Sequence, residues 1–542
     1  MMMSERRLSN WCFENSMKQS KEVDWNSFGD ELWNIANIFR SDIVKPTEYL
    51  EEFSYLFFLR LFDEQEIYQE NIAKELGEDY KSTIPSEYRF FSWACDPRNY
   101  ARSRGFKTVI EFLDKMFLDL ANLPNTGDPK IDEDRSIIRK IFSNKIRRMQ
   151  NDNTVIQVVD RLRLLKLPED EGRKFDALGR GYEFLMYKLG QQGNYGQYFT
   201  PRNIVSFMVR IIDPNPGEVI LDPAAGTGGF LVRAFEYVKQ KIERQITNEA
   251  DKEIKIRELK HNLYGIEKAP DVFKLGLMNL RLHGDGSSNF ENLDALSGSV
   301  QSAYKEKADV IITNPPFGPF SGEPTGNFKY KFKRFETYFI QAIMDMVKPG
   351  GRVATVMLEG FLFNENYEGI RRDLVDKFKI EAVFSLPAGV FLPYSNAKTD
   401  ILIFKKPNKG EKTTDNVLFF NIESDGYELK PTRKPIGDCG KKGDIDGCGD
   451  LPLALEIYQK FKIGEEIPQT EQYFVIDVEE IRKHDYRLDI NIYRKVKLEE
   501  ENADPKQLIE LMETNLSEAM KKLNELKNIL GIGDENDSQN RY

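Results

Sequence analysis

The stretch Glu218-Val-Ile-Leu-Asp-Pro-Ala-Ala-Gly-Thr-Gly-Gly-Phe230 indicates the fold class of this 542-residue chain. It begins like a short buried strand, passes through a glycine-rich turn, and ends where a helical pattern begins. A strand, a glycine-rich turn and a helix form the first unit of a nucleotide-binding α/β domain. No Gly-Lys-Ser/Thr follows, so the turn is not a phosphate-binding P-loop. Because Asp222 precedes the turn, a cationic or amine-bearing ligand suits it better than a pyrophosphate.

A second motif, Asn314-Pro-Pro-Phe317, follows the apolar run Val310-Ile-Ile-Thr313. We expect it at the carboxyl ends of the strands, where open α/β sheets bind their ligands. The two prolines stiffen the turn and carry no backbone N–H donor. The Asn314 side-chain oxygen and the Pro315 carbonyl can then accept hydrogen bonds from one amino group, while Phe317 offers a flat face to a planar ring. The alternative is a tight Asn-Pro turn with a core phenylalanine.

The segment Leu263-Tyr-Gly-Ile-Glu267 predicts a second strand, which ends in a carboxylate that can accept both ribose hydroxyls. Its distance from the first motif exceeds the roughly 20 residues of a dinucleotide site. We attribute the excess to a lengthened helix over Lys239–His261. The alternation of strands and helices predicts a parallel sheet with covered faces, whose last strand is antiparallel because no crossover helix precedes it. The expected strands lie near 218–222, 262–267, 308–313, 351–357, 380–385 and 399–405, with a further one at 417–422.

These motifs and their order resemble those of the modification (M) subunit of type I restriction–modification systems. That family consists of γ-class N6-adenine DNA methyltransferases that use S-adenosylmethionine. The resemblance extends over roughly 24–406 and includes Gly196-Gln-Tyr-Phe-Thr-Pro-Arg202 and Ser385-Leu-Pro-Ala-Gly-Val-Phe391. The chain departs from the family in having Ala225 in place of the usual Cys. It also has Met357-Leu-Glu-Gly360 where the family tends to carry Leu-Pro-Asp/Asn-Gly, so no role is assigned to Glu359.

The resemblance implies an α/β fold: a Rossmann-like S-adenosylmethionine-dependent methyltransferase sheet with an N-terminal helical domain and a C-terminal helical tail. The expected boundaries are 1–170, 171–465 and 466–542. S-adenosylmethionine is the implied cofactor, and no metal is implied. Thr200-Pro201 is read as a helix start with Thr200 as the cap. The implied catalytic residues are Asn314, Pro315, Pro316 and Phe317, and the implied cofactor-binding residues are Tyr198, Phe199, Thr200, Asp222, Ala224, Gly226, Thr227, Gly228, Gly229, Glu267 and Asp294.

Within this set, Glu267 would hold the ribose hydroxyls and Asp294 the adenine amine of the cofactor. The alternative for Asp294 is an acid in a surface loop. The target adenine must leave the DNA duplex, at a cost of a few kcal/mol. Its amine is a poor nucleophile because the lone pair is delocalised into the ring. Two acceptors, Asn314 and Pro315, would localise that pair, so positioning and electrostatics replace a strong general base.

Composition limits the other possibilities. Apolar residues make up 40% of the chain, and no stretch approaches the ~20 apolar residues of a membrane span. The start, Met-Met-Met-Ser-Glu-Arg-Arg, lacks an apolar signal core, so a cytoplasmic protein is expected. The four cysteines, Cys12, Cys95, Cys439 and Cys448, predict no disulfide framework, and the last two are expected as free thiols in a glycine-rich loop.

The expected partners are double-stranded DNA and other subunits. A net charge of −11 disfavours a protein that grips DNA phosphates alone and favours a partner that supplies part of the grip. The resemblance implies a specificity (S) subunit, a restriction (R) subunit and two M subunits for each S subunit. The segment Phe328–Phe335, with interleaved basic and aromatic residues, is either a phosphate-gripping strand or an amphipathic edge.

The C-terminal tail predicts a helix with a coiled-coil seam, because its apolar residues are spaced alternately by three and four. The seam either packs on its own domain or binds a partner, and the resemblance favours the specificity subunit. The seam residues are Ile509, Met512, Leu516, Ala519, Leu523, Leu526 and Leu530.

Two other functions remain open from the sequence. Protein-glutamine N5 methyltransferases use a similar Asn-Pro-Pro corner, usually with Tyr in the fourth place, where this chain has Phe317. A non-catalytic scaffold that binds the cofactor would also keep the glycine-rich turn. N4-cytosine methylation usually replaces the Asn by Ser, so Asn314 favours adenine.

Overall fold

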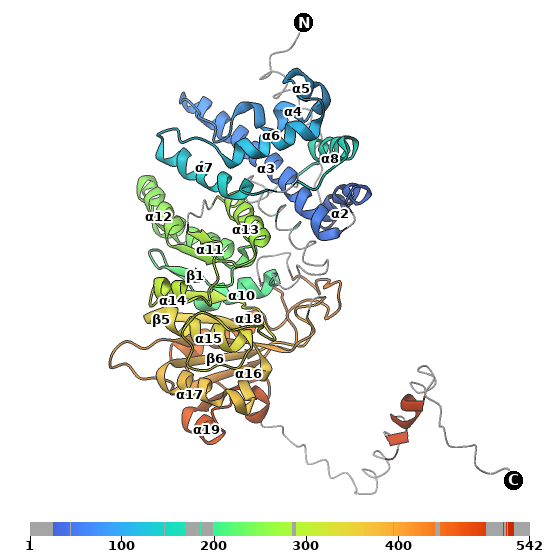
Figure 1. Cartoon of the computed structure of the whole chain (residues 1–542). Helices are drawn as coiled ribbons and strands as arrows, with labels where there is room; N and C mark the ends of the chain where they lie inside the picture. The colour runs from blue at the N-terminus through green and yellow to red at the C-terminus, as the bar shows by residue number, and fades with distance from the viewer. Residues whose placement is uncertain are drawn as a thin grey trace, which may run out of the picture. The chain divides into compact units, whose positions relative to one another are not determined.

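A computed structural model describes most of the chain (Figure 1). The described residues are 25–43, 45–145, 147–167, 182, 185, 199–284, 289–393, 395–439, 445–494, 513, 516, 517 and 519–524. They fall into two units, Met1–Tyr493 and Arg494–Tyr542, and the first unit holds both the N-terminal helices and the sheet.

The N-terminal part of the first unit is helical, as its apolar spacing predicts. The longest helix, α3, stops at Gly77, whose φ of 74° is the left-handed conformation that commonly ends helices. The fully buried rings of Phe53, Phe57 and Phe58 on α3 form the centre of this region. The elements are α2 (Trp25–Ala36), η1 (Asn37–Ser41), α3 (Pro46–Leu76), η2 (Ser86–Tyr88), α4 (Phe90–Trp93), α5 (Pro97–Ser103), α6 (Val109–Ala121), α7 (Pro129–Phe142) and α8 (Asp152–Leu164).

A nine-stranded sheet follows, in the order β3-β2-β1-β4-β5-β7-β6-β8-β9. The strands are parallel except β7 and β9, which run antiparallel to their neighbours. The expected α/β fold and the antiparallel strand near 399–405 are therefore confirmed, whereas β3 and β9 were not expected. The strands are β1 (Ile220–Asp222), β2 (Leu263–Ile266), β3 (Phe290–Glu291), β4 (Ala308–Thr313), β5 (Val347–Leu358), β6 (Lys379–Ser385), β7 (Thr399–Lys405), β8 (Asn416–Asn421) and β9 (Tyr473–Asp477).

Helices cover both faces of this sheet because successive strand side chains point to opposite sides. Val310 and Ile312 belong to one hydrophobic cluster and Ile311 to the other. The first cluster also draws on α10 (Arg202–Ile212), α11 (Gly229–Gln245), α12 (Glu249–His261), α13 (Pro270–Leu282) and α18 (Leu451–Lys462). The second draws on α14 (Gly298–Tyr304), α15 (Phe335–Met346), α16 (Glu359–Phe363), η4 (Glu365–Tyr367), α17 (Glu368–Lys377), α19 (Val478–Lys483) and η5 (Ile490–Ile492).

Two boundaries differ from those expected. The predicted single helix over Lys239–His261 is two helices, α11 and α12, because the Asn248 side chain accepts the backbone N–H of Asp251 and starts a new helix. The segment after 466 does not begin a separate tail: β9 pairs with β8, and the second unit starts at Arg494. The helical region and the sheet share one hydrophobic cluster, and the domain boundary expected at 170 stays a prediction.

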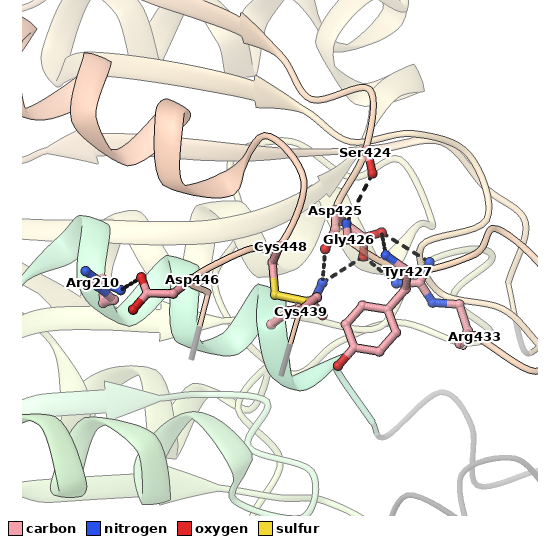
Figure 2. Close-up of a disulfide and its surroundings, with 10 residues drawn as sticks. Arg210, Ser424, Asp425, Gly426, Tyr427, Arg433, Cys439, Asp446 and Cys448 are labelled. Atoms are coloured by element: carbon pink, nitrogen blue, oxygen red, sulfur yellow. Dashed lines mark hydrogen bonds and ion pairs between the residues drawn. A yellow bond between two sulfur atoms is a disulfide. The ribbon is translucent and has the colours of Figure 1, made fainter. Parts of the chain in front are cut away.

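The structure also corrects the expectation for the cysteines. Cys439 and Cys448 form a disulfide beside α10, with their Cα atoms 4.4 Å apart (Figure 2). The chain folds back on itself here, since Ile436 N–H donates to the Gly426 carbonyl at 2.8 Å and thereby brings the two cysteines together. Cys95 is also disulfide-bonded. Sequence spacing alone gives no sign of this loop closure.

In the part of the chain that the structure describes, no helix is long and apolar enough to cross a membrane.

Candidate active site

The glycine-rich turn after β1 lies against the end of β2. The backbone N–H of Ala225 donates to the Ile266 carbonyl at 2.9 Å. Gly226 and Gly228 have φ values of 54° and 78°, which L side chains rarely adopt. A Cβ on Gly228 would lie 3.3 Å from the Leu280 side chain, so glycine also allows the turn to approach α13. The turn is therefore fixed in a conformation that presents its backbone at the carboxyl edge of the sheet.

Glu267, directly after β2, fastens this turn. Its Oε2 accepts the Gly226 N–H at 3.0 Å, and its Oε1 accepts the Ala269 N–H at 2.7 Å. The side chain is buried, and burial raises its pKa, while the backbone N–H groups of Ala269, Gly226 and Lys268 lower it in part. Each carboxylate oxygen has a second lone pair, so Glu267 can still accept hydroxyl groups from a ligand.

Asp222, the last residue of β1, is a buried carboxyl with spare hydrogen-bonding capacity. Its Oδ1 accepts the Ala224 N–H at 3.1 Å. Burial raises the pKa of Asp222 to about 7, and the Glu267 carboxylate adds to the rise. The nearby Thr313 hydroxyl lowers this pKa in part. Among the described residues, Oδ2 of Asp222 has no hydrogen-bond partner of normal geometry, and neither has the Thr313 hydroxyl.

Asp294 lies in the loop between β3 and α14, near the end of β2. Its Oδ2 forms an ion pair with Lys268 at 2.8 Å, and its Oδ1 accepts the Leu296 N–H at 2.9 Å. The Asn292 amide donates to the carbonyls of Glu267 and Lys268, so this loop and the end of β2 are joined. The carboxylate of Asp294 is about one-third exposed. Asp294 therefore lies at the expected carboxyl edge of the sheet. A ligand that binds its carboxylate would have to displace Lys268.

The Asn-Pro-Pro-Phe motif follows β4 directly, as expected. The Asn314 Nδ2 donates to the Thr200 hydroxyl at 3.0 Å, whereas Oδ1 is buried and has no partner among the described residues. Pro315 is buried, and Phe317 is half-buried against the cluster that contains α10. The motif's downstream end is fixed by Glu336, which accepts the Gly318 N–H at 3.0 Å.

The other predicted site residues lie at the following places. Tyr198 lies outside the described residues. Phe199 is half-buried and packs on the same cluster as Phe317. Thr227 is buried in the turn, and its carbonyl accepts the Asn279 amide at 3.0 Å. Ala224 and Pro316 are half-buried, and Gly229 begins α11.

Thr200 does not cap α10, contrary to the expected helix start. The helix begins at Arg202 with Pro201 in the cap position and no side-chain cap bond. The phosphate-gripping strand expected at Phe328–Phe335 is not formed either: this segment is an irregular loop with Phe328 buried. Its Lys331 and Lys333 are exposed beyond the Asn314 motif.

Comparison with known proteins shows the family to which the chain belongs. Residues 173–502 match the family model described as N-6 DNA methylase. The chain belongs to this N-6 DNA methylase family. Residues 28–162 of the methylase match a second model, the HsdM N-terminal domain, which corresponds to helices α2 to α8.

Individual relatives agree. The methylase is 31% identical to the type I restriction enzyme EcoEI methylase subunit of Escherichia coli, over 93% of this chain and 98% of that protein. It is 28% identical to the EcoKI methylase subunit of E. coli strain K12, over 87% of this chain and 84% of that one. Among solved structures, one from a study of complex assembly and conformational transition of the type I R-M system has a TM-score of 0.64 and 28% identity, covering 94% of this chain and 99% of that chain.

The function follows from these matches. The methylase is the modification subunit of a type I restriction–modification system, and its activity is that of an adenine-specific DNA methyltransferase.

One polar cluster of the methylase was not expected from its sequence. Asp400 on β7 is fully buried opposite Ser385 of β6, and neither its two oxygens nor the Ser385 hydroxyl has a hydrogen-bond partner among the described residues. Burial raises the pKa of Asp400 to about 8, and the Glu359 carboxylate adds to the rise. Glu359 itself pairs with Lys398 at 2.9 Å. A charged residue within the apolar strand Thr399–Lys405 was the signal that could have revealed this cluster.

In the described part of the methylase, no group of three or more His, Cys, Asp or Glu side chains could hold a metal ion.

Proposed function

We propose that this methylase transfers a methyl group from S-adenosylmethionine to N6 of an adenine flipped out of double-stranded DNA. The observation that carries the proposal is the state of Asn314. Its amide nitrogen donates to Thr200, and its oxygen is buried at the end of β4 without a partner among the described residues. A buried unpaired acceptor is costly and is rare without a function. An exocyclic amine, which is a hydrogen-bond donor, satisfies it.

The residues at the ends of β1 and β2 fit the cofactor. Glu267 has lone pairs available for the ribose hydroxyls, and Oδ2 of Asp222 has no partner within the described residues. Gly228 lets the turn approach closely where a side chain would be strained. Asp294 would accept the adenine amine of the cofactor if its carboxylate leaves Lys268. When bound, S-adenosylmethionine supplies a methyl group on a positively charged sulfur.

The protein's contribution to the transfer is positioning. Oδ1 of Asn314 and the carbonyl of Pro315 accept the two amine hydrogens and draw the nitrogen towards tetrahedral geometry, which localises its lone pair. S-adenosylmethionine, held by Glu267 and the turn at Gly228, would supply the methyl group for this nitrogen, and the methylated amine would release one proton to solvent. Pro316 stiffens the turn, and Phe317 stacks on the base. Phe199, which packs on the same cluster as Phe317, adds to the proposed pocket. Tyr198, which lies outside the described residues, stays a proposed site residue from the sequence.

The proposed partners are DNA, a specificity subunit and a restriction subunit, with two copies of the methylase for each specificity subunit. The exposed Lys331 and Lys333 are suited to contact phosphates beside the motif. With a net charge of −11, the chain needs a partner for much of its grip on DNA. The seam in the tail supports docking of that partner: of its described residues, Leu516 and Leu523 are 69% and 48% exposed. Because DNA is the substrate, we place the reaction in the cytoplasm.

Tritiated S-adenosylmethionine tests the function directly. The methylase, co-purified with the specificity subunit of its own system, is expected to label duplex DNA that carries the recognised sequence, with the label recovered as N6-methyladenine after digestion. A glutamine-containing peptide is expected to remain unlabelled. The Asn314→Ala complex is the matched control and is expected to transfer almost no label. Label on the peptide, or on cytosine, would contradict the proposal.

A further inference from the structure

The second half of α13 lies against the glycine-rich turn that follows β1. A Cβ on Gly276 would lie 3.1 Å from the Gly226 carbonyl oxygen, so the backbone of the helix approaches the turn closely. Three residues further along, Nδ2 of Asn279 donates to the Thr227 carbonyl at 3.0 Å. Residues three apart lie on the same face of a helix. One face of α13 therefore holds the turn, by close packing and by a hydrogen bond.

The hydrogen bond from Asn279 can form in one direction only. A backbone carbonyl accepts and cannot donate, so only the Nδ2 end of the amide can pair with Thr227. The Asn279 side chain is buried, and its Oδ1 has no partner among the described residues. A buried amide with one unpaired end costs stability relative to an apolar side chain. What Asn279 adds in return, within the described part of the chain, is the bond to the Thr227 carbonyl.

The backbone around Thr227 needs such a contact to keep one conformation. Thr227 lies between Gly226 and Gly228, whose φ values are 54° and 78°. Glycine adopts positive and negative φ about equally readily, so the peptide units on either side of Thr227 can rotate at low cost. Glu267 holds the beginning of the turn through the Gly226 N–H. Asn279 holds its end through the Thr227 carbonyl, which opposes that rotation.

The N-terminal helices fix the end of α13 in turn. Gln65 of α3 is buried, and its Nε2 donates to the Leu282 carbonyl at 2.7 Å. Arg281 forms an ion pair with Asp134 of α7 at 3.1 Å. Both contacts lie within three residues of Asn279. Helices α3 and α7 therefore hold the backbone from which the Asn279 amide reaches the turn.

We infer that Asn279 is a positioning residue that keeps the glycine-rich turn in its cofactor-binding conformation, and that the N-terminal helices support it through Gln65. The inference rests on the proposed binding of S-adenosylmethionine at this turn. When only a fraction of the protein has the binding conformation, the apparent Kd rises by the inverse of that fraction. Loss of the Asn279 amide therefore weakens cofactor binding. The transfer step, which uses Asn314, keeps its rate once the cofactor is bound.

The test uses Asn279→Leu, which keeps the approximate size of the side chain and removes the donor, and Asn279→Ala, which removes the donor without adding apolar volume. Each variant is assayed as the full complex with its specificity subunit. Calorimetry gives the S-adenosylmethionine Kd, and single-turnover labelling at saturating cofactor and DNA gives the transfer rate. For both variants we expect the Kd to rise about tenfold, the size of one hydrogen bond, and the rate to stay within about threefold of wild type.

Leu277→Ala is the matched control. Leu277 is as buried on α13 as Asn279 and carries no polar group that could hold the turn. This variant is expected to unfold at a lower urea concentration and to keep the wild-type Kd. If Leu277→Ala weakens cofactor binding as much as the Asn279 variants do, general loosening of the helix explains the effect, and the inference is overturned.

Gln65→Leu tests the support from the N-terminal helices. Because Gln65 acts through Asn279, we expect its loss to raise the Kd about threefold in the wild-type background and less than about twofold in the Asn279→Leu background. An equal rise in both backgrounds, or none in either, overturns the role given to those helices. An unchanged Kd in the Asn279 variants overturns the inference as a whole. In all these cases the proposed function stands, whereas a wild-type complex that does not bind S-adenosylmethionine overturns both together.

Discussion

Replacing Asp400 by asparagine is expected to stabilise the methylase, and the gain is expected to grow with pH. Asp400 is fully buried between β5 and β6, and its two oxygens have no hydrogen-bond partner among the described residues. Burial raises its pKa to about 8 from an ordinary value of 3.8. Of the charged groups around it, the carboxylates of Glu359 and Asp489 raise this pKa further, and Lys398 lowers it. Asparagine has the same shape and carries no charge to bury.

The sign follows from linkage between proton binding and folding. Between about pH 4 and pH 8 the folded protein keeps the Asp400 proton and the unfolded chain does not, so stability falls as the pH rises. The stability that the protonated Asp400 contributes is fully present below pH 3.8, its pKa in the unfolded chain. It is lost by about pH 8, its pKa in the folded protein. At roughly 1.4 kcal/mol for each pH unit, the total loss has an upper limit of about 6 kcal/mol. Asp400→Asn removes this loss, so the variant and the wild type should converge at acidic pH and separate steadily towards pH 8.

Urea unfolding followed by circular dichroism at several values between pH 5 and pH 9 measures the difference. Asp477→Asn is the matched control, since Asp477 is an exposed carboxylate at the end of β9 that accepts the Glu479 N–H, and asparagine can also fill this role. The control is expected to show no such slope. A difference between Asp400→Asn and wild type that is flat across this range, or that shrinks as the pH rises, would show that Asp400 is ionised in the folded protein and would refute the reasoning.

Three further changes test the site and the tail. Asn314→Ala should lower the transfer rate by ~10²–10³, the cost of losing one transition-state hydrogen bond, while the S-adenosylmethionine Kd from calorimetry stays within twofold; near-normal turnover would remove Asn314 from the site. Glu267→Ala should weaken cofactor binding by ~1.5–3 kcal/mol, both through the lost ribose contact and through release of the Gly226 N–H, and an unchanged affinity would contradict this assignment. Deleting the chain after Asn502 should spare cofactor binding, because the described site residues lie within Met1–Tyr493, and should abolish co-purification with the specificity subunit. A truncated protein that still co-purifies would place the docking surface elsewhere.

The sequence was sufficient to predict seven of the strands and the edge of the sheet at which the motifs lie, because both depend on local patterns. Buried strands such as Ala308–Thr313 are short apolar runs, and a polar motif directly after such a run lies at the carboxyl edge of a parallel sheet. Residues from four separate segments thus meet at this edge: Gly226 donates to Glu267, and Asn314 lies beside the segment that precedes α10. The antiparallel direction of β7 followed from the lack of a crossover helix before it.

What the sequence could not predict depends on pairing between distant residues. The strand β9 has an ordinary composition, and only its register with β8 gives it a place in the sheet. The disulfide between Cys439 and Cys448 requires a loop closure that spacing does not encode. Lys268 competes for Asp294 because two loops from neighbouring strands converge. Thr200 fitted a familiar helix-start pattern, yet tertiary contact with Asn314 determined its use.

The carboxyl edge of the sheet concentrates buried acids, and this suits the ligand proposed for it. Burial raises the pKa of Asp222 and of Glu267, and the Glu267 carboxylate raises that of Asp222 further. Such acids destabilise the folded protein while the site lacks a positive charge. A cationic ligand reverses that effect, since it favours the ionised form of an acid whose pKa is about 7, and an anionic pyrophosphate would increase it. The acid that precedes the glycine-rich turn therefore disfavours a dinucleotide and favours a sulfonium, which supports the cofactor proposed for this site.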